Sequence, residues 1–170
     1  MHIFREIQPK DWNANPFDAI GSQWMLIAAG QGEKVNAMTA SWGGVGVLWG
    51  KNVAYVFIRH SRYTKEFVDA ADTFSLTFFE RGEYAGMLGY MGKVSGRDEN
   101  KIEKAGLTIL HEEETPYFGE AHTALICRKM GRHPIDPAGF IDPEVNGKWY
   151  SNGDYHDMYV AEITKILVKE

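Results

Sequence analysis

The stretch that decides the fold is WMLIAAGQGEKVNAMTAS, residues 24–41. It opens with a short apolar run, residues 24–29, which is typical of a buried β-strand. Gly30, Gln31 and Gly32 supply turn residues, and residues 35–41 have the composition of a returning strand. The pattern predicts a β-hairpin, so the sheet should begin with two antiparallel strands.

Further strands are expected downstream, and helices are expected between them. The strand-like segments are residues 53–58, 73–79, 107–110, 121–129 and 159–168, and the helix-like segments are the one after Ser61, 83–90 and 98–105. Residues 43–50 are glycine-rich, and residues 131–153 are expected to form a long loop because prolines and glycines lie among polar residues. The order is no regular alternation of strands and helices. It predicts one domain, residues 1–170, that is mostly β with α: a small antiparallel barrel with short helices outside.

Composition excludes several classes of protein. The chain has 18 basic and 23 acidic residues, a formal net charge of −5, which argues against a nucleic-acid-coating protein. The only cysteine, Cys127, rules out an internal disulfide and favours a cytoplasmic setting. No apolar run approaches the ~20 residues of a membrane helix, and the start does not resemble a signal peptide, so no membrane association is expected.

The sequence also lacks the common catalytic and nucleotide-binding motifs. It contains no G-x-G-x-x-G, no phosphate-binding loop ending in Gly-Lys-Ser/Thr, no zinc-protease H-E-x-x-H and no G-x-S-x-G. The six histidines are far apart along the chain, and none forms an i, i+4 pair, so no metal site is expected.

The strongest local signal is RHSRYTK, residues 59–65, which joins a strand to the first turn of a helix. A helix N-terminus carries free backbone N–H groups and a partial positive charge, so it can hold an anion. Ser61 and Thr64 add hydroxyls, while Arg59 and Arg62 add guanidinium groups suited to phosphate. The alternative is that Ser61 only caps the helix and the basic side chains lie in solvent.

Three other segments are weaker signals when each is taken alone. NAMTASW, residues 36–42, has small residues on a strand, which leave room for a flat ligand or simply pack inside. In SGRDENK, residues 95–101, the Asp98–Lys101 spacing is usual for a solvated helix pair. His156 precedes the last strand, where a lone histidine is more often part of the surface than a ligand contact.

Together and in this order, the four segments resemble the flavin reductase family, which includes the flavoredoxins and has an FMN-binding split-barrel fold. The resemblance covers roughly residues 24–166. It implies that Ser61, Arg62 and Thr64 hold the FMN phosphate, while Trp42 flanks the ring or the ribityl chain. It also places Lys101 near the flavin, where a cation stabilises the anionic reduced form, and His156 at the ring as the candidate catalytic residue. The strand residues expected along the isoalloxazine are Asn36, Met38, Thr39, Ala40 and Ser41.

The resemblance implies a flavoprotein and leaves its activity open. One function is that of an oxidoreductase that uses NADH or NADPH to reduce flavin; the other is a flavoredoxin-type electron carrier reduced by a protein partner. A third is a split barrel that has lost its flavin. The family further implies a homodimer with the flavin at the subunit interface.

Overall fold

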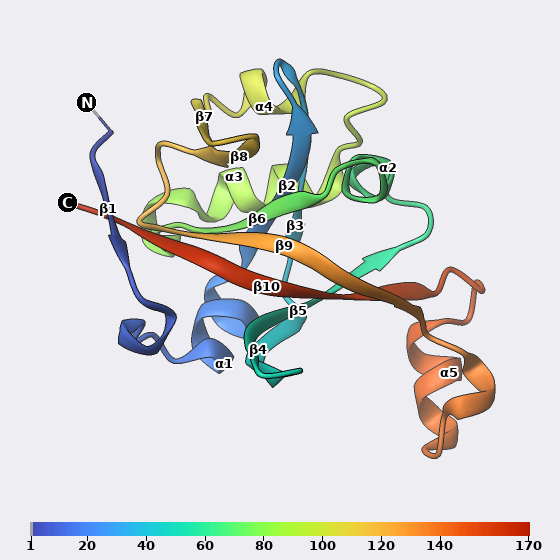
Figure 1. Ribbon diagram of the computed structural model, residues 1–170. Coiled ribbons are helices and arrows are strands. Elements are labelled where there is room, and N and C mark those ends of the chain that lie inside the picture. The colour runs from blue at the N-terminus through green and yellow to red at the C-terminus, as the bar shows by residue number, and fades with distance from the viewer. Residues whose placement is uncertain (1) are drawn as a thin grey trace.

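The computed structural model describes residues 2–170, and Figure 1 shows a strongly bent antiparallel sheet with helices around it. The strands are β1 (Phe4–Ile7), β2 (Met25–Gln31), β3 (Lys34–Ala40), β4 (Gly43–Leu48), β5 (Lys51–Arg59), β6 (Thr73–Phe78), β7 (Ile109–Glu112), β8 (Thr115–Phe118), β9 (Thr123–Pro134) and β10 (His156–Lys169). The helical segments are η1 (Pro9–Asp11), α1 (Pro16–Asp18), η2 (Ala19–Gln23), α2 (Tyr63–Ala70), α3 (Arg81–Lys93), α4 (Lys101–Lys104), η3 (Pro137–Gly139) and α5 (Pro143–Trp149). No described helix is long and apolar enough to cross a membrane.

The main sheet has the order β3-β2-β6-β9-β10-β5-β4, with β1 paired to β10. Every neighbouring pair is antiparallel, which confirms the predicted sheet type. The predicted hairpin is present as β2 and β3, with Met25 opposite Ala40. Strand β10 pairs with β9 along nearly its whole length, and its register shifts at two places. Such bulges increase strand twist. Along its other edge, β10 pairs with β5 over its first half and with β1 near its end.

The core lies on both faces of the sheet. Met25 and Ile27 of β2 belong to a cluster with Val56 and Phe74, whereas Leu26 packs on the other face with residues of α3. Because β2 is buried on both faces, its sequence is continuously apolar rather than alternating. This explains why the run at residues 24–29 predicts a strand correctly.

Strands β1 and β8 are additional to those expected from the sequence, and two other segments also differ from the expectation. Residues 43–50 contain a regular strand, β4, in which glycine is needed at Gly43 because a Cβ there would lie 2.7 Å from the Tyr55 carbonyl oxygen. Residues 131–153 are no plain loop, because β9 continues to Pro134 and α5 forms after it. Asp142 caps α5 by accepting a hydrogen bond from the Glu144 N–H. Figure 1 shows α5 at the end of the sheet where β9 stops and β10 starts.

Candidate functional site

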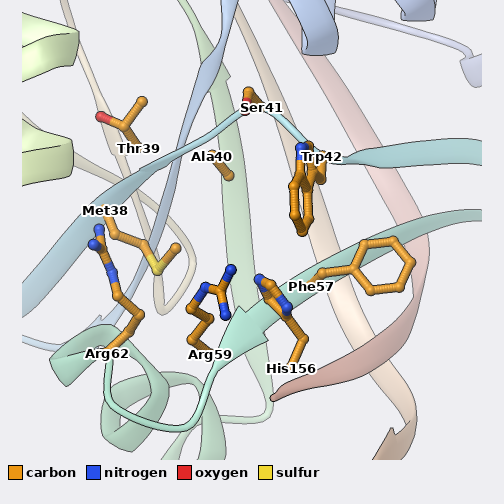
Figure 2. Close-up of a pocket in the computed structure, with 9 residues that line it drawn as sticks. All are labelled: Met38, Thr39, Ala40, Ser41, Trp42, Phe57, Arg59, Arg62 and His156. Atoms are coloured by element: carbon orange, nitrogen blue, oxygen red, sulfur yellow. The ribbon is translucent and has the colours of Figure 1, made fainter. Parts of the chain in front are cut away.

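The first pocket lies between the end of β3, strand β5 and the start of β10. Figure 2 shows Ser41 and Trp42 on one side of it and Arg59 and His156 on the other. The lining residues are Met38, Thr39, Ala40, Ser41, Trp42, Phe57, Arg59, Arg62 and His156.

Small residues allow helix α3 to approach the β3 side of this pocket. The Thr39 hydroxyl donates a hydrogen bond to the Leu88 carbonyl oxygen at 2.5 Å. A Cβ added to Gly92 would lie 3.1 Å from the Thr39 Cβ, so the helix and the strand are in close contact. The contact fixes β3 in place, and the small residues Ala40 and Ser41 leave room beside the strand.

Aromatic rings form the rim of the pocket just beyond the end of β3. The Trp42 ring centroid lies 5.0 Å from that of Trp149 and 5.2 Å from that of His156. His156 Nδ1 lies 2.9 Å from the Tyr150 hydroxyl oxygen. Burial, reinforced by the positive charge of Arg59, lowers the pKa of His156 from 6.5 to about 4. The imidazole is therefore neutral near pH 7.

A second pocket adjoins the first, and Arg62 lines both. It lies between the start of α2 and the segment that follows α3. Its lining residues are Asn36, Ser61, Arg62, Tyr63, Thr64, Lys93, Val94, Ser95, Gly96 and Lys101. Three of these side chains are cationic and none is acidic, so the pocket favours an anion.

Lys101 is the most informative residue of the second pocket. It is 3% exposed, and its ammonium donates to the carbonyl oxygens of Met91 and Val94 at 2.8 and 2.9 Å. Burial, with Arg62 nearby, lowers its pKa from 10.5 to about 8. Within residues 2–170 no carboxylate pairs with this buried ammonium, so it is a good partner for an anionic ligand. The expected solvated pair with Asp98 is wrong, because Lys101 is buried instead.

The start of α2 differs in detail from the expected anion site. Arg62, rather than Ser61, is the N-cap residue, and its side chain makes no capping bond. The Arg62 guanidinium instead donates to the Gly92 carbonyl oxygen at 2.9 Å, and burial lowers the pKa of Arg62. The backbone N–H groups of Tyr63 and Thr64 have no hydrogen-bond acceptor within residues 2–170. They remain available to a ligand.

Ser61 already has a partner within the chain. Its hydroxyl donates to Asp154 Oδ2 at 2.6 Å, and its backbone N–H donates to Asp154 Oδ1 at 3.1 Å. The capping alternative for Ser61 is therefore wrong, because Asp154 holds Ser61 from a segment just before β10.

The structure brings all the predicted site residues to these two pockets. Met38, Thr39, Ala40, Ser41, Trp42 and His156 line the first; Asn36, Ser61, Thr64 and Lys101 line the second; Arg62 lines both. Asn36 and Lys101 thus lie beside the predicted phosphate residues rather than with His156. The Asn36 amide donates to the Thr64 hydroxyl at 2.8 Å. A Cβ at Gly96 would lie 2.2 Å from Asn36 Oδ1, so glycine permits this packing.

Sequence reasoning missed Phe57, Tyr150 and Asp154, and it offered Arg59 as a phosphate ligand, whereas Arg59 lines the first pocket and not the second. Alternation along β5 could have identified Phe57 and its place beside Arg59, because the two residues point to the same face of the strand. Arg59 then lies opposite His156 in the β5–β10 register. Nothing in the local sequence signals Tyr150 or Asp154, whose contacts depend on the path of residues 135–155.

The fold and the two pockets define an antiparallel split barrel in which an aromatic-rimmed pocket and a cationic pocket share Arg62. The chain belongs to the flavin reductase like domain family, whose model matches residues 17–170. A comparison with curated proteins gave no match.

Solved structures share this fold at low sequence identity. An FMN-binding domain of a flavin reductases-like enzyme from Shewanella baltica aligns with TM-score 0.70 and 14% identity, over 98% of this chain and 78% of its own. Flavoredoxin of Desulfovibrio vulgaris (Miyazaki F) aligns with TM-score 0.68 and 22% identity, over 96% and 78%. The flavin reductase PheA2 aligns with TM-score 0.61 and 14% identity, over 87% and 80%. The predicted split-barrel fold is confirmed.

Proposed function

We propose that the protein binds FMN and acts as an NAD(P)H-dependent flavin reductase. The observation that carries the proposal is the junction of the two pockets at Arg62. One pocket holds the buried cation Lys101, which has no carboxylate partner within residues 2–170, and the other is lined by residues at the end of β3 and by a neutral histidine. The two pockets suit a ligand with a planar ring at one end and a phosphate at the other.

The phosphate would lie in the second pocket. Arg62 and Lys101 supply charge-assisted hydrogen bonds, and the free N–H groups of Tyr63 and Thr64 supply neutral ones. One such cluster suits a monophosphate, and the sequence has no second glycine-rich turn for a pyrophosphate. This favours FMN over FAD. The similar domain from Shewanella baltica is FMN-binding, which supports the same ligand.

The isoalloxazine would lie in the first pocket along Met38–Ser41, with Trp42 at its edge. FMN supplies a ring that accepts a hydride from a nicotinamide. Around it, Arg59 and Arg62 provide positive charge that favours a negatively charged ring. Lys101 lies in the other pocket. We therefore assign the stabilisation of the negatively charged ring to the two arginines and not to Lys101. The neutral His156 and Trp42 exclude water from one side and leave space for the nicotinamide.

Anaerobic stopped-flow absorbance with NADH and with NADPH tests the proposed activity. Hydride transfer needs the nicotinamide stacked on the ring, and the chain has no dinucleotide-binding motif of its own. Few contacts should give a high KM, toward the upper end of the ~1 μM–1 mM range. Reduction of the bound flavin within seconds supports the reductase. If neither nucleotide reduces the flavin but dithionite does, the protein is a carrier of the flavoredoxin type.

We also propose that the protein is a homodimer with the flavin at its interface. Large apolar side chains are exposed near the first pocket, including Trp42, Trp149 and, at 88% exposure, Phe17. A cluster of exposed large apolar side chains usually marks a surface that binds another protein chain. Light scattering should give twice 19.2 kDa at micromolar concentration, whereas a mass near 19.2 kDa would contradict the dimer.

A further inference from the structure

Tyr150 connects the segment around α5 to the first pocket. It follows α5 directly and is 6% exposed. Its ring stacks on Phe140 and Tyr155, with centroids 5.8 and 4.8 Å away, and the Arg59 guanidinium lies 5.2 Å from the ring centroid. These contacts hold the ring, so the position of its hydroxyl is fixed as well.

The Tyr150 hydroxyl has one partner within residues 2–170, His156 Nδ1 at 2.9 Å. A neutral phenol is a donor that needs an acceptor when it is buried. A neutral imidazole has one nitrogen that donates and one that accepts. Both requirements are met at once if the phenol donates to Nδ1, and the imidazole hydrogen is then on Nε2.

The nearest cation does not compete for Nδ1. The two terminal nitrogens of Arg59 donate to the carbonyl oxygens of Asp154 and Trp149, at 2.5 and 3.1 Å. Arg59 therefore holds the segment that carries Tyr150 and leaves Nδ1 to the phenol. Its positive charge also opposes protonation of the imidazole.

His156 Nε2 is open to the first pocket. Every fully buried side-chain nitrogen or oxygen among the described residues has a hydrogen-bond partner. Nε2 has no partner within residues 2–170, so this atom is accessible to solvent. His156 lines the first pocket, as Figure 2 shows. The atom that carries the hydrogen is thus the one that a ligand can reach.

We propose that Tyr150 is a positioning residue that fixes His156 in the Nε2–H tautomer, so that the pocket presents a hydrogen-bond donor to a carbonyl oxygen of the substrate. For the reductase the carbonyl is that of the nicotinamide carboxamide. The identity of the substrate rests on the proposed function, whereas the tautomer does not. A fixed tautomer matters because the other one would offer a lone pair to the same oxygen and repel it.

Nitrogen-15 NMR of the histidine side chains, recorded on the protein without flavin or nucleotide, tests the tautomer directly. Wild type should show a protonated Nε2 and an unprotonated Nδ1 for His156 near pH 7. Tyr150→Phe keeps the stacked ring and removes the donor, so the two tautomers should mix. Tyr155→Phe is the matched control, because the Tyr155 hydroxyl donates to Asn146 instead, and it should leave the wild-type spectrum unchanged. A wild-type spectrum with hydrogen on Nδ1 overturns the proposal even if neither variant folds.

Kinetics test the role in substrate recognition. Tyr150→Phe should raise the KM for the nicotinamide nucleotide about threefold to tenfold, the scale of one weakened hydrogen bond, with a smaller change in kcat. If Tyr150→Phe mixes the tautomers of His156 but leaves the KM unchanged, Tyr150 fixes the tautomer and His156 does not contact the substrate. If NAD(P)H does not reduce the flavin bound to the wild-type protein, the proposed reductase activity is wrong. The NMR result on the tautomer is unaffected.

Discussion

The Asp154 carboxylate accepts hydrogen bonds from both the backbone N–H and the hydroxyl of Ser61, at 3.1 and 2.6 Å. The two residues are 93 positions apart, and their contact joins the segment before β10 to the start of α2. It also places a negative charge next to the pocket proposed for the FMN phosphate, close enough to favour the charged form of Arg62. Asp154 therefore has two opposing effects: its hydrogen bonds order the anion site, and its negative charge repels an anion bound there.

Asp154→Asn should tighten FMN binding. The amide oxygen can still accept a hydrogen bond from Ser61, whereas the repulsion between the carboxylate and the phosphate is lost. We expect the Kd to fall about threefold to tenfold, the effect of one like charge near a partly exposed site. Fluorescence titration with FMN measures it, with Asp142→Asn at the cap of α5 as the control. Weaker binding would mean that the ordering effect of Asp154 dominates.

Arg62→Ala should weaken FMN binding by about 1–3 kcal/mol, the usual contribution of a charged hydrogen bond to phosphate. Ser61→Ala should cost less, because the Ser61 hydroxyl already donates to Asp154 and is not a free donor. Isothermal titration calorimetry gives both values. If Arg62→Ala binds FMN as tightly as wild type, the phosphate does not lie in the second pocket.

FMN affinity should fall above about pH 8 because of Lys101. Its pKa is lowered to about 8 in the free protein, and a bound phosphate raises the pKa. Below about pH 8 the ammonium is charged in both states and affinity is at its maximum. Above it, binding must take up a proton, so the Kd should rise roughly tenfold between about pH 7.5 and about pH 9.5.

Two variants isolate the contribution of Lys101 to this pH dependence. Lys101→Gln should bind FMN more weakly, with a Kd that stays flat over the same range. Lys104→Gln changes an exposed lysine on the same helix that pairs with Glu99, and it should keep the wild-type curve. A flat wild-type curve would show that Lys101 does not contact the anion.

His156 should make the fold less stable in acid. Its pKa is about 4 in the folded protein against an ordinary value of 6.5, so the unfolded state takes up a proton first as the pH falls. The contribution of neutral His156 to stability is complete above about pH 6.5 and is lost progressively toward about pH 4. Urea unfolding should show a shallower acid dependence for His156→Gln than for wild type. Equal slopes would contradict the lowered pKa.

Local patterns in the sequence predict the strands that are buried on both faces or rich in β-branched residues. They miss β4 because glycine has a low strand propensity. The glycines of β4 are present because the strand lies close to Tyr55. They miss α5 because Pro143 and Gly147 resemble loop residues, although Asp142-Pro143 is a helix-start signal.

The site was predictable where it follows one segment and not where distant segments meet. Residues 38–42 line the first pocket and residues 61–64 line the second, whereas Asn36, expected along the ring, lies in the second. The burial of Lys101 depends on carbonyl groups at the end of α3, and the partner of Ser61 comes from residue 154. Long-range pairings of this kind leave no periodicity or spacing in the sequence.

The identity of the bound flavin is the most direct test of the proposed function, because every proposal about ligand binding in the two pockets depends on it. The purified protein, loaded with a mixture of FMN and FAD and freed of excess, is denatured, and the released flavin is separated by chromatography. We expect a yellow protein that releases FMN in about one equivalent per chain. A colourless protein, or FAD as the main species released, would contradict it.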